Sequence, residues 1–283
     1  MSHSPSAGRN TPGMDTAQTP ELHPHITEYY ADRFDEVDRL TVDALGRLEL
    51  ERTKELLLRE LPSAPARILD IGGGPGVYAA WLASLGYEVT LIEPVARHRG
   101  QAAEHGTFAV EAGDARALDA PDASADAVLL LGPLYHLVDQ DDRAQALREA
   151  NRVVRPGGLI AVAFISRQAP ILDLAGKLAI NDDDVYGILS TLNHRGANNF
   201  EFGFTVAYFH TADEIRQDFT AAGLAVPELF GIEGPLLPLI RSGLVEDRAD
   251  YFEAALRAAR LADDHPELLA ASGHLLAVTH GTQ

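Results

Sequence analysis

The sequence ILDIGGGPG, at residues 68–76, decides the fold of this chain. An apolar run that contains the acidic residue Asp70 passes directly into a glycine-rich turn, and a helical pattern follows from about Val77. Glycine permits a tight turn and lets a ligand approach the backbone, while the first turn of a helix presents free N–H groups. The stretch therefore predicts a buried strand, a nucleotide-binding turn and a helix.

Strands and helices alternate on the C-terminal side of this turn. The strand-like runs are YEVTLIE (87–93), TFAVEAG (107–113), DAVLLL (126–131) and LIAVAFIS (159–166), with helical patterns at about 77–85, 95–104 and 141–154. Such an alternation favours a parallel sheet built from right-handed βαβ units, and near-continuous apolar strands fit a sheet covered on both faces. We therefore expect a doubly wound α/β core.

The rest of the chain divides into segments by the same patterns. Residues 1–20 are rich in Ser, Pro, Gly and Thr, which predicts a disordered tail, and residues 21–64 have the apolar spacing of helices. After the α/β core at 65–166 the alternation breaks over residues 167–205, which indicates an inserted cap. Residues 206–283 then complete the core, with strands expected in VPELFGIEG and SGHLLAVTHG and helices between them.

Two local signals define helix starts in the second half. Thr211 with Glu214 predicts a capping box. The triple Asp182-Asp183-Asp184 suits the cap and first turn of a helix better than a metal site, so no metal is expected.

Composition excludes several classes of function. The formal net charge of -19 and the lack of a basic run disfavour a nucleic-acid substrate. The absence of cysteine removes disulfides, thiolate zinc sites and cysteine nucleophiles. No stretch approaches the roughly 18–20 apolar residues of a membrane span, and the polar start is unlike a secretory signal, so we expect a cytoplasmic protein that does not bind membranes.

The glycine turn resembles one nucleotide-binding motif and departs from two others. A dinucleotide fingerprint would need glycine where Val77 stands, and no Gly-Lys-Ser/Thr of a P-loop is present. Residues 70–76 resemble the first motif of the class I methyltransferases that use S-adenosylmethionine (SAM), and the resemblance continues in order from about 65 to 166. It implies a seven-stranded, mostly parallel sheet with N-terminal helices and a helical cap. It also implies that Gly72 and Gly74 wrap the amino-acid part of SAM and that Asp70 helps to hold its amino group.

Two further acidic residues follow the next strands at matching places. Glu93 ends the second strand, where a carboxylate accepts both ribose hydroxyls. Asp114 resembles the family's adenine-binding acid, and the N–H of Ala115 is a second expected contact. SAM is therefore the expected cofactor, with S-adenosylhomocysteine (SAH) as its product.

The end of the fourth strand, LLGPLYHL at residues 130–137, resembles bacterial members of the methyltransferase-11-like group. In this family that strand end, which includes Leu131, lies under the sulfonium and faces the acceptor. Methyl transfer mainly needs positioning, and a base helps only where the acceptor must lose a proton. His136 is the first candidate for such a base, and Tyr135 and Tyr30 are candidates to close over the sulfonium.

Polar residues in and after the expected cap are candidates to recognise the acceptor. They are His194, Arg195, Asn199, Tyr208 and His210. If the cap closes over the pocket, these side chains face the acceptor.

The function expected from the resemblance is methyl transfer from SAM to an oxygen or nitrogen atom of a small molecule, with secondary metabolism as one setting. The alternatives are methylation of carbon in an alkene or aromatic ring, and a SAM-binding protein without catalysis. A dehydrogenase is the fold-level alternative, against which the glycine spacing argues. A homodimer is an option because closed pairs are common.

Overall fold

The computed structural model describes residues 22–30, 36–198, 204–244 and 248–282, so the tail predicted to be disordered lies outside the described residues. The main sheet runs in the order β3 (Ala109–Glu111), β2 (Glu88–Ile92), β1 (Arg67–Ile71), β4 (Ala125–Leu130), β5 (Val154–Ile165), β9 (His274–His280) and β8 (Glu228–Gly231). β1 to β5 pair in parallel, and β9 pairs antiparallel with both β5 and β8. This confirms the seven-stranded, mostly parallel sheet.

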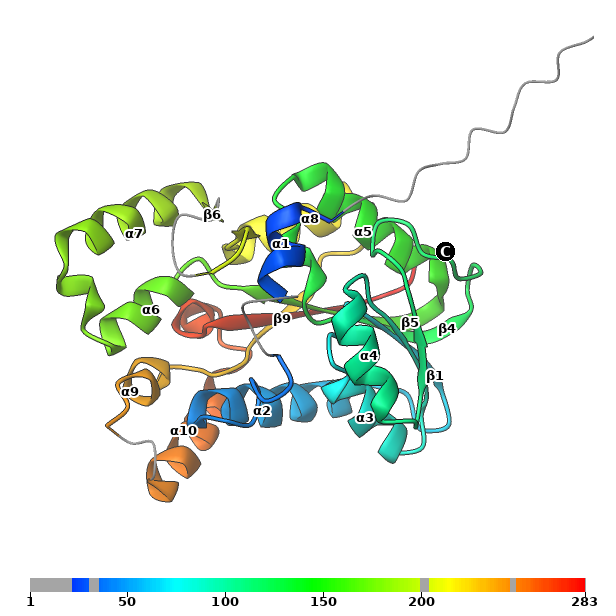
Figure 1. Cartoon of the computed structure of the whole chain (residues 1–283), viewed down its shortest axis with the longest axis horizontal. Helices are drawn as coiled ribbons and strands as arrows, with labels where there is room; N and C mark the ends of the chain where they lie inside the picture. Colours follow the sequence, from blue (N-terminus) through cyan, green and yellow to red (C-terminus); the bar gives the residue numbers. More distant parts are fainter. Residues whose placement is uncertain (1–21, 31–35, 199–203, 245–247, 283) are drawn as a thin grey trace, which may run out of the picture.

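Helices cover both faces of this sheet (Figure 1). One face packs on α5 (Gln140–Val153) and α8 (Ala212–Ala221), and the other packs on α2 (Ala44–Glu60), α3 (Val77–Ser84) and α4 (Ala96–Glu104). Successive residues of a strand point to opposite faces, and β4 follows this rule with apolar residues on both sides. Val128 and Leu130 are buried in the first core, and Ala127 and Leu129 in the second. The near-continuous apolar strands thus reflect a sheet covered on both faces.

The antiparallel strand β9 brings distant residues to one edge of the sheet. Its first residue, His274, pairs with Ile165, the last residue of β5, and Gly231 at the end of β8 pairs with Leu275. The segment that follows β8 therefore lies at the edge where β1 and β2 also end. This carboxyl edge is where open α/β sheets bind ligands.

A second group of helices stands beside this edge. It comprises α6 (Ala169–Gly176), η3 (Ala179–Asn181), α7 (Asp183–Arg195), α9 (Leu237–Arg241) and α10 (Ala249–Ala262). The first half of α2 packs on α9 and α10 through Leu45, Leu48 and Leu237. In Figure 1, α6 and α7 extend to one side of the sheet, and no helix among the described residues is long and apolar enough to span a membrane.

Both local helix-start predictions are confirmed. The Thr211 hydroxyl accepts from the backbone N–H of Glu214 at 3.2 Å, and Glu214 Oε2 accepts from the N–H of Thr211 at 2.8 Å, which is a capping box. Asp182 accepts from the N–H groups of Asp184 and Val185 at the start of α7.

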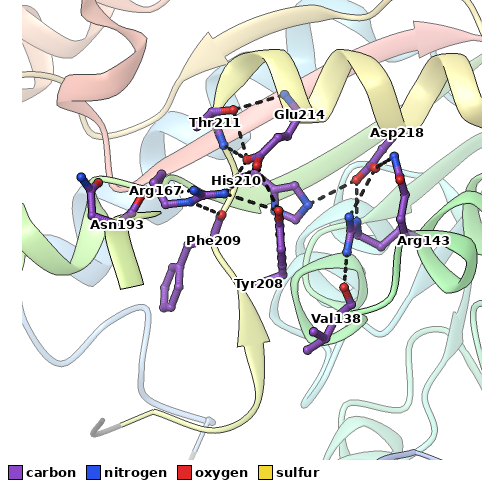
Figure 2. A network of polar contacts seen from close by, with 11 residues as sticks. Val138, Arg143, Arg167, Asn193, Tyr208, Phe209, His210, Thr211, Glu214 and Asp218 are labelled. Carbon is purple, nitrogen blue, oxygen red and sulfur yellow. Dashed lines mark hydrogen bonds and ion pairs between the residues drawn. The ribbon is translucent and has the colours of Figure 1, made fainter. Parts of the chain in front are cut away.

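A buried polar network ties α8 to the rest of the core (Figure 2). Arg143 of α5 donates through Nε to Asp218 Oδ2 at 2.6 Å and through Nη1 to the carbonyls of Leu137 and Val138. His210 Nε2 lies 3.3 Å from the same Asp218 oxygen. Asp218 therefore compensates Arg143, and Arg143 holds the segment that follows β4.

We expect Asp218→Ala to lower the free energy of unfolding by about 3–5 kcal/mol, because it leaves the Arg143 guanidinium buried without its partner. Urea denaturation followed by circular dichroism measures the change. Asp213→Ala is the matched control on the same helix, since its side chain is 84% exposed and its pair with Arg216 is at the surface. Equal losses in the two variants would contradict a structural role for the network.

Candidate active site

The glycine loop between β1 and α3 leaves no room for side chains. Gly72, Gly74 and Gly76 have φ angles of +68°, +57° and +88°, which other residues rarely adopt. A Cβ atom on Gly72 would lie 2.9 Å from Pro133 Cδ, and one on Gly73 would overlap the Asp70 carboxylate. The loop is thus a cradle of bare backbone at the carboxyl edge of the sheet.

Two carboxylates stand at the neighbouring strand ends, as the sequence predicts. Glu93 accepts hydrogen bonds from the N–H groups of Gly74 at 3.0 Å and Val95 at 2.8 Å. Asp114 pairs with Arg116, whose Nε lies 2.9 Å from Asp114 Oδ1. Both carboxylates line the cavity over the glycine loop, so they face a common ligand space.

Asp70 is buried without compensation. It is 0% exposed, and among the described residues its carboxylate has only a weak contact with the backbone N–H of Ala79. Burial and the nearby charge of Glu93 raise the pKa of Asp70 to about 7, and the N–H of Ala79 offsets this only in part. Such a carboxylate lacks a cationic partner.

Two cavities adjoin at this edge. The smaller one has a volume of about 130 Å³, and it is lined by the glycine loop, Glu93, Asp114, Ala115 and Leu131. Leu22, Ile26 and Tyr30 complete the wall, and we call residues 22–30 the Tyr30 segment. The larger one, of about 900 Å³, lies between the ends of β5 and β9 and the helices α2, α6 and α9. Tyr30, Glu36, Arg39 and Tyr135 line both cavities.

Comparison with known proteins finds relatives of the part of the chain that holds this site. A family model described as a methyltransferase domain matches residues 69–162. The methyltransferase GfsG of Streptomyces halstedii is 30% identical over 49% of this chain and 51% of its own length. A ubiquinone biosynthesis O-methyltransferase of Rhizobium leguminosarum bv. trifolii is 30% identical over 60% of this chain and 64% of its own.

A solved structure agrees in fold. It is a SAM-dependent methyltransferase of Thermotoga maritima, described as a possible histamine N-methyltransferase, with a TM-score of 0.53 and 19% identity over 83% of this chain and 89% of that one. These matches support a class I SAM-dependent methyltransferase domain at residues 69–162. The chain spans about half the length of the curated relatives that it matches.

The residues present fit SAM, the cofactor of this enzyme class. The glycine cradle admits a chain close to the backbone, and Glu93 offers two acceptor oxygens in the same cavity. The Asp70 carboxylate lies against Gly73 and does not itself line the cavity, so its predicted hold on the SAM amino group stays a prediction. Ligand pockets usually enclose roughly 300–1,000 Å³. The smaller cavity lies below that range in this structure.

The structure places His136 beside Tyr30 at the junction of the two cavities. Nδ1 faces the carbonyl of Val206 at 3.1 Å, so Nδ1 carries the proton, and Nε2 accepts from the Tyr30 hydroxyl at 2.9 Å. Burial lowers the pKa of His136 to about 4, although the Val206 carbonyl and the charge of Glu93 act in the opposite direction. With both nitrogens engaged, His136 holds the Tyr30 segment, and its predicted role as a base stays a prediction.

The predicted acceptor-binding residues do not gather at either cavity. His194 and Arg195 are exposed on α7, and Asn199 lies outside the described residues. Tyr208 and His210 belong to the buried network of Figure 2: the Tyr208 ring lies under the Arg143 guanidinium, and its hydroxyl donates to Glu214 at 3.0 Å. None of the four described residues lines either of these two cavities, and their role in recognising the acceptor stays a prediction.

Sequence reasoning missed a polar group on the wall of the larger cavity. Arg39 makes a two-pronged pair with Glu49 at 2.7 and 2.9 Å, and His274 lies 3.9 Å from Glu49 Oε2 and hydrogen-bonds Glu233. Glu49, Glu233 and His274 place three potential metal-binding atoms within 4.8 Å of one another. Arg39 already engages both oxygens of Glu49, so the charge of this carboxylate is compensated.

Asp70→Asn should make the cofactor-free protein relatively more stable at high pH. The carboxyl binds its proton more tightly in the folded protein, with a pKa of about 7, than in the unfolded chain. Its contribution to the free energy of unfolding therefore falls as the pH rises from about 4 to 7. The difference between variant and wild type should grow by about 2–3 kcal/mol between pH 5 and pH 8, from about 1.4 kcal/mol per pH unit.

Urea denaturation at the two pH values tests this prediction. Glu111→Gln, at the exposed end of β3, is the control and should show a constant difference from wild type. A constant difference for Asp70→Asn as well would mean that Asp70 ionises normally.

Proposed function

We propose that this protein transfers the methyl group of SAM to an oxygen or nitrogen atom of a small molecule. One observation carries the proposal: the cavity over the glycine loop and the larger cavity share Tyr30, Glu36, Arg39 and Tyr135. A methyl donor in the first cavity and an acceptor in the second would meet at these residues. Methyl transfer requires such an in-line approach and the exclusion of water.

The larger cavity supports a small acceptor. Its volume of about 900 Å³ falls within the usual range for small-molecule sites. Apolar side chains from several elements form much of its wall, including Leu45, Ile165, Leu174, Leu237 and Phe209. We propose an acceptor that is partly apolar and that carries the nucleophilic atom at its polar end. The cytoplasmic location and the homodimer remain predictions from the sequence.

The cofactor part of the proposal is tested by calorimetry with SAH. We expect wild-type protein to bind SAH and Glu93→Ala and Asp70→Ala to bind it about 10–100-fold more weakly, because each loses an interaction with a charged group worth about 1.5–3 kcal/mol. Glu111→Ala, an exposed acid at the neighbouring strand end, should bind like wild type. Absence of SAH binding by the wild type would overturn the cofactor assignment.

The transfer step is tested with methyl-labelled SAM and a fractionated pool of metabolites. Label in a small-molecule product, with its position found by mass spectrometry and NMR, separates attachment to oxygen, nitrogen and carbon. Label on carbon would favour the alternative of alkene or ring methylation. Intact SAM in every fraction, despite SAH binding, would favour a SAM-binding protein without catalysis.

A further inference from the structure

We propose that His274, held in place by Glu233, is the general base that takes the proton from a hydroxyl acceptor in the larger cavity. The inference deepens the proposed function and rests on it. It assigns the acceptor a chemical class, an O–H group, and assigns the proton a destination on this chain.

The fold brings the two residues together at the acceptor side of the carboxyl edge. His274 begins β9, and Glu233 follows the end of β8, its antiparallel neighbour. Glu233 Oε2 accepts from the backbone N–H of His274 at 2.9 Å, and Oε1 hydrogen-bonds the ring nitrogen Nδ1. Glu233 is 0% exposed, so its carboxylate is fixed by both contacts. Both residues line the larger cavity.

The hydrogen bond to Glu233 determines which ring nitrogen of His274 is free. A carboxylate only accepts, so Nδ1 must carry the proton, and in the neutral ring Nε2 keeps its lone pair. No hydrogen bond or ion pair from a described residue reaches Nε2, and the side chain is 23% exposed. A base oriented by a buried carboxylate and open to the substrate space is the arrangement that general-base catalysis requires.

The charged groups around His274 determine the direction in which its pKa is shifted. Burial alone would lower its pKa, but the charges of Glu49 and Glu233 and the hydrogen bond to Glu233 outweigh burial, and the pKa is raised despite the opposing charge of Arg39. Arg39 pairs with Glu49, and together with His274 and Arg241 it overcomes the effect of burial and lowers the pKa of Glu49 to about 2. Glu49 therefore stays ionised and steadies the imidazolium that a transferred proton creates.

His136 provides the contrast. Both histidines carry the proton on Nδ1, but the lone pair of His136 Nε2 already accepts from Tyr30, and the pKa of that ring is lowered to about 4. At neutral pH the ring of His136 is neutral, but the lone pair of its Nε2 already accepts the hydrogen bond from Tyr30. The Nε2 of His274 has no such donor among the described residues.

The step balances in atoms and charge. SAM, when bound, supplies a methyl carbon whose bond to sulfur breaks, with the electron pair moving to sulfur to leave SAH. The acceptor oxygen forms the new bond to carbon, and its proton passes to His274 Nε2, which becomes an imidazolium paired with Glu233. That proton returns to solvent through the open cavity. A hydroxyl needs this help because its oxygen attacks better as the proton leaves, whereas a neutral amine attacks through its lone pair.

Histidine NMR of the unliganded protein provides a readout besides activity. In ¹⁵N-labelled protein we expect His274, identified by loss of its signals in His274→Gln, to show the proton on Nδ1 and a pKa above 6.5. Glu233→Gln should lower that pKa by about one unit or more, because it removes a paired charge. An unchanged pKa in Glu233→Gln would overturn the dyad.

Kinetics with the acceptor found in the screen test the catalytic role. We expect His274→Gln to lower kcat about 10²–10⁴-fold while KM and SAH affinity change little, and the wild-type rate to rise with pH up to the measured pKa of His274. His280→Gln, at the exposed far end of the same strand, is the matched control and should behave as wild type. Thermal melting of each variant checks folding.

Different results would contradict the role of His274 and the proposed methyl transfer. Methyl transfer by the wild type that persists within threefold in His274→Gln overturns the base assignment and leaves the proposed function intact. Product labelled on an amine nitrogen, with no hydroxyl methylated, overturns the acceptor class. Absence of transfer to every acceptor overturns the proposed function, and this inference with it.

Discussion

The backbone ladder between β5 and β9 is the interaction on which the site depends. Seven residue pairs join Leu159–Ile165 to His274–His280 in antiparallel register. This ladder covers the edge that β5 would otherwise expose and supplies β8 with its only sheet neighbour among the described strands. It also reverses the chain direction, so that a residue at the start of a strand reaches the edge where the parallel strands end.

That reversal divides the carboxyl edge into two chemically different halves. The loops after β1, β2 and β3 present a bare backbone cradle and the acids Glu93 and Asp114 to the smaller cavity. On the other side, α2, the end of β8 and the start of β9 present Glu49 paired with Arg39 and Glu233 hydrogen-bonded to His274. The first half suits the hydroxyls and charged groups of a cofactor, and the second combines paired carboxylates with an imidazole on the wall of a largely apolar cavity.

The sequence predicts features that neighbouring residues form, and it does not predict contacts between residues that lie far apart in the chain. The glycine turn and the capping box of Thr211 and Glu214 each involve residues a few positions apart, and Glu93 and Asp114 each follow directly on a strand that the sequence predicts. Glu233 and His274 are 41 positions apart, and only the pairing of β8 with β9 joins them. Both strands are recognisable in the sequence, and the residues at their adjoining ends were the signal that could have revealed the dyad.

The surroundings of Tyr208 and His210 were also beyond the reach of the sequence. Tyr208 and His210 are polar and follow the predicted cap. In the structure they contact Arg143 and Asp218 in a buried network. Arg143 and Asp218 come from two helices, and the sequence does not reveal how these helices pack. Propensity and spacing cannot distinguish a polar residue that faces a cavity from one that is satisfied inside the core. The burial of the side chain and its hydrogen-bond partners distinguish the two cases, and both depend on the fold.

The Tyr30 segment has a kinetic consequence. It forms part of the wall of the smaller cavity, and the hydrogen bond between Tyr30 and His136 holds it in place. If the cofactor enters under this segment and its product leaves the same way, turnover can be no faster than the opening of the segment, whatever the speed of bond formation. Such an opening would break the buried hydrogen bond between Tyr30 and His136 once in each cycle.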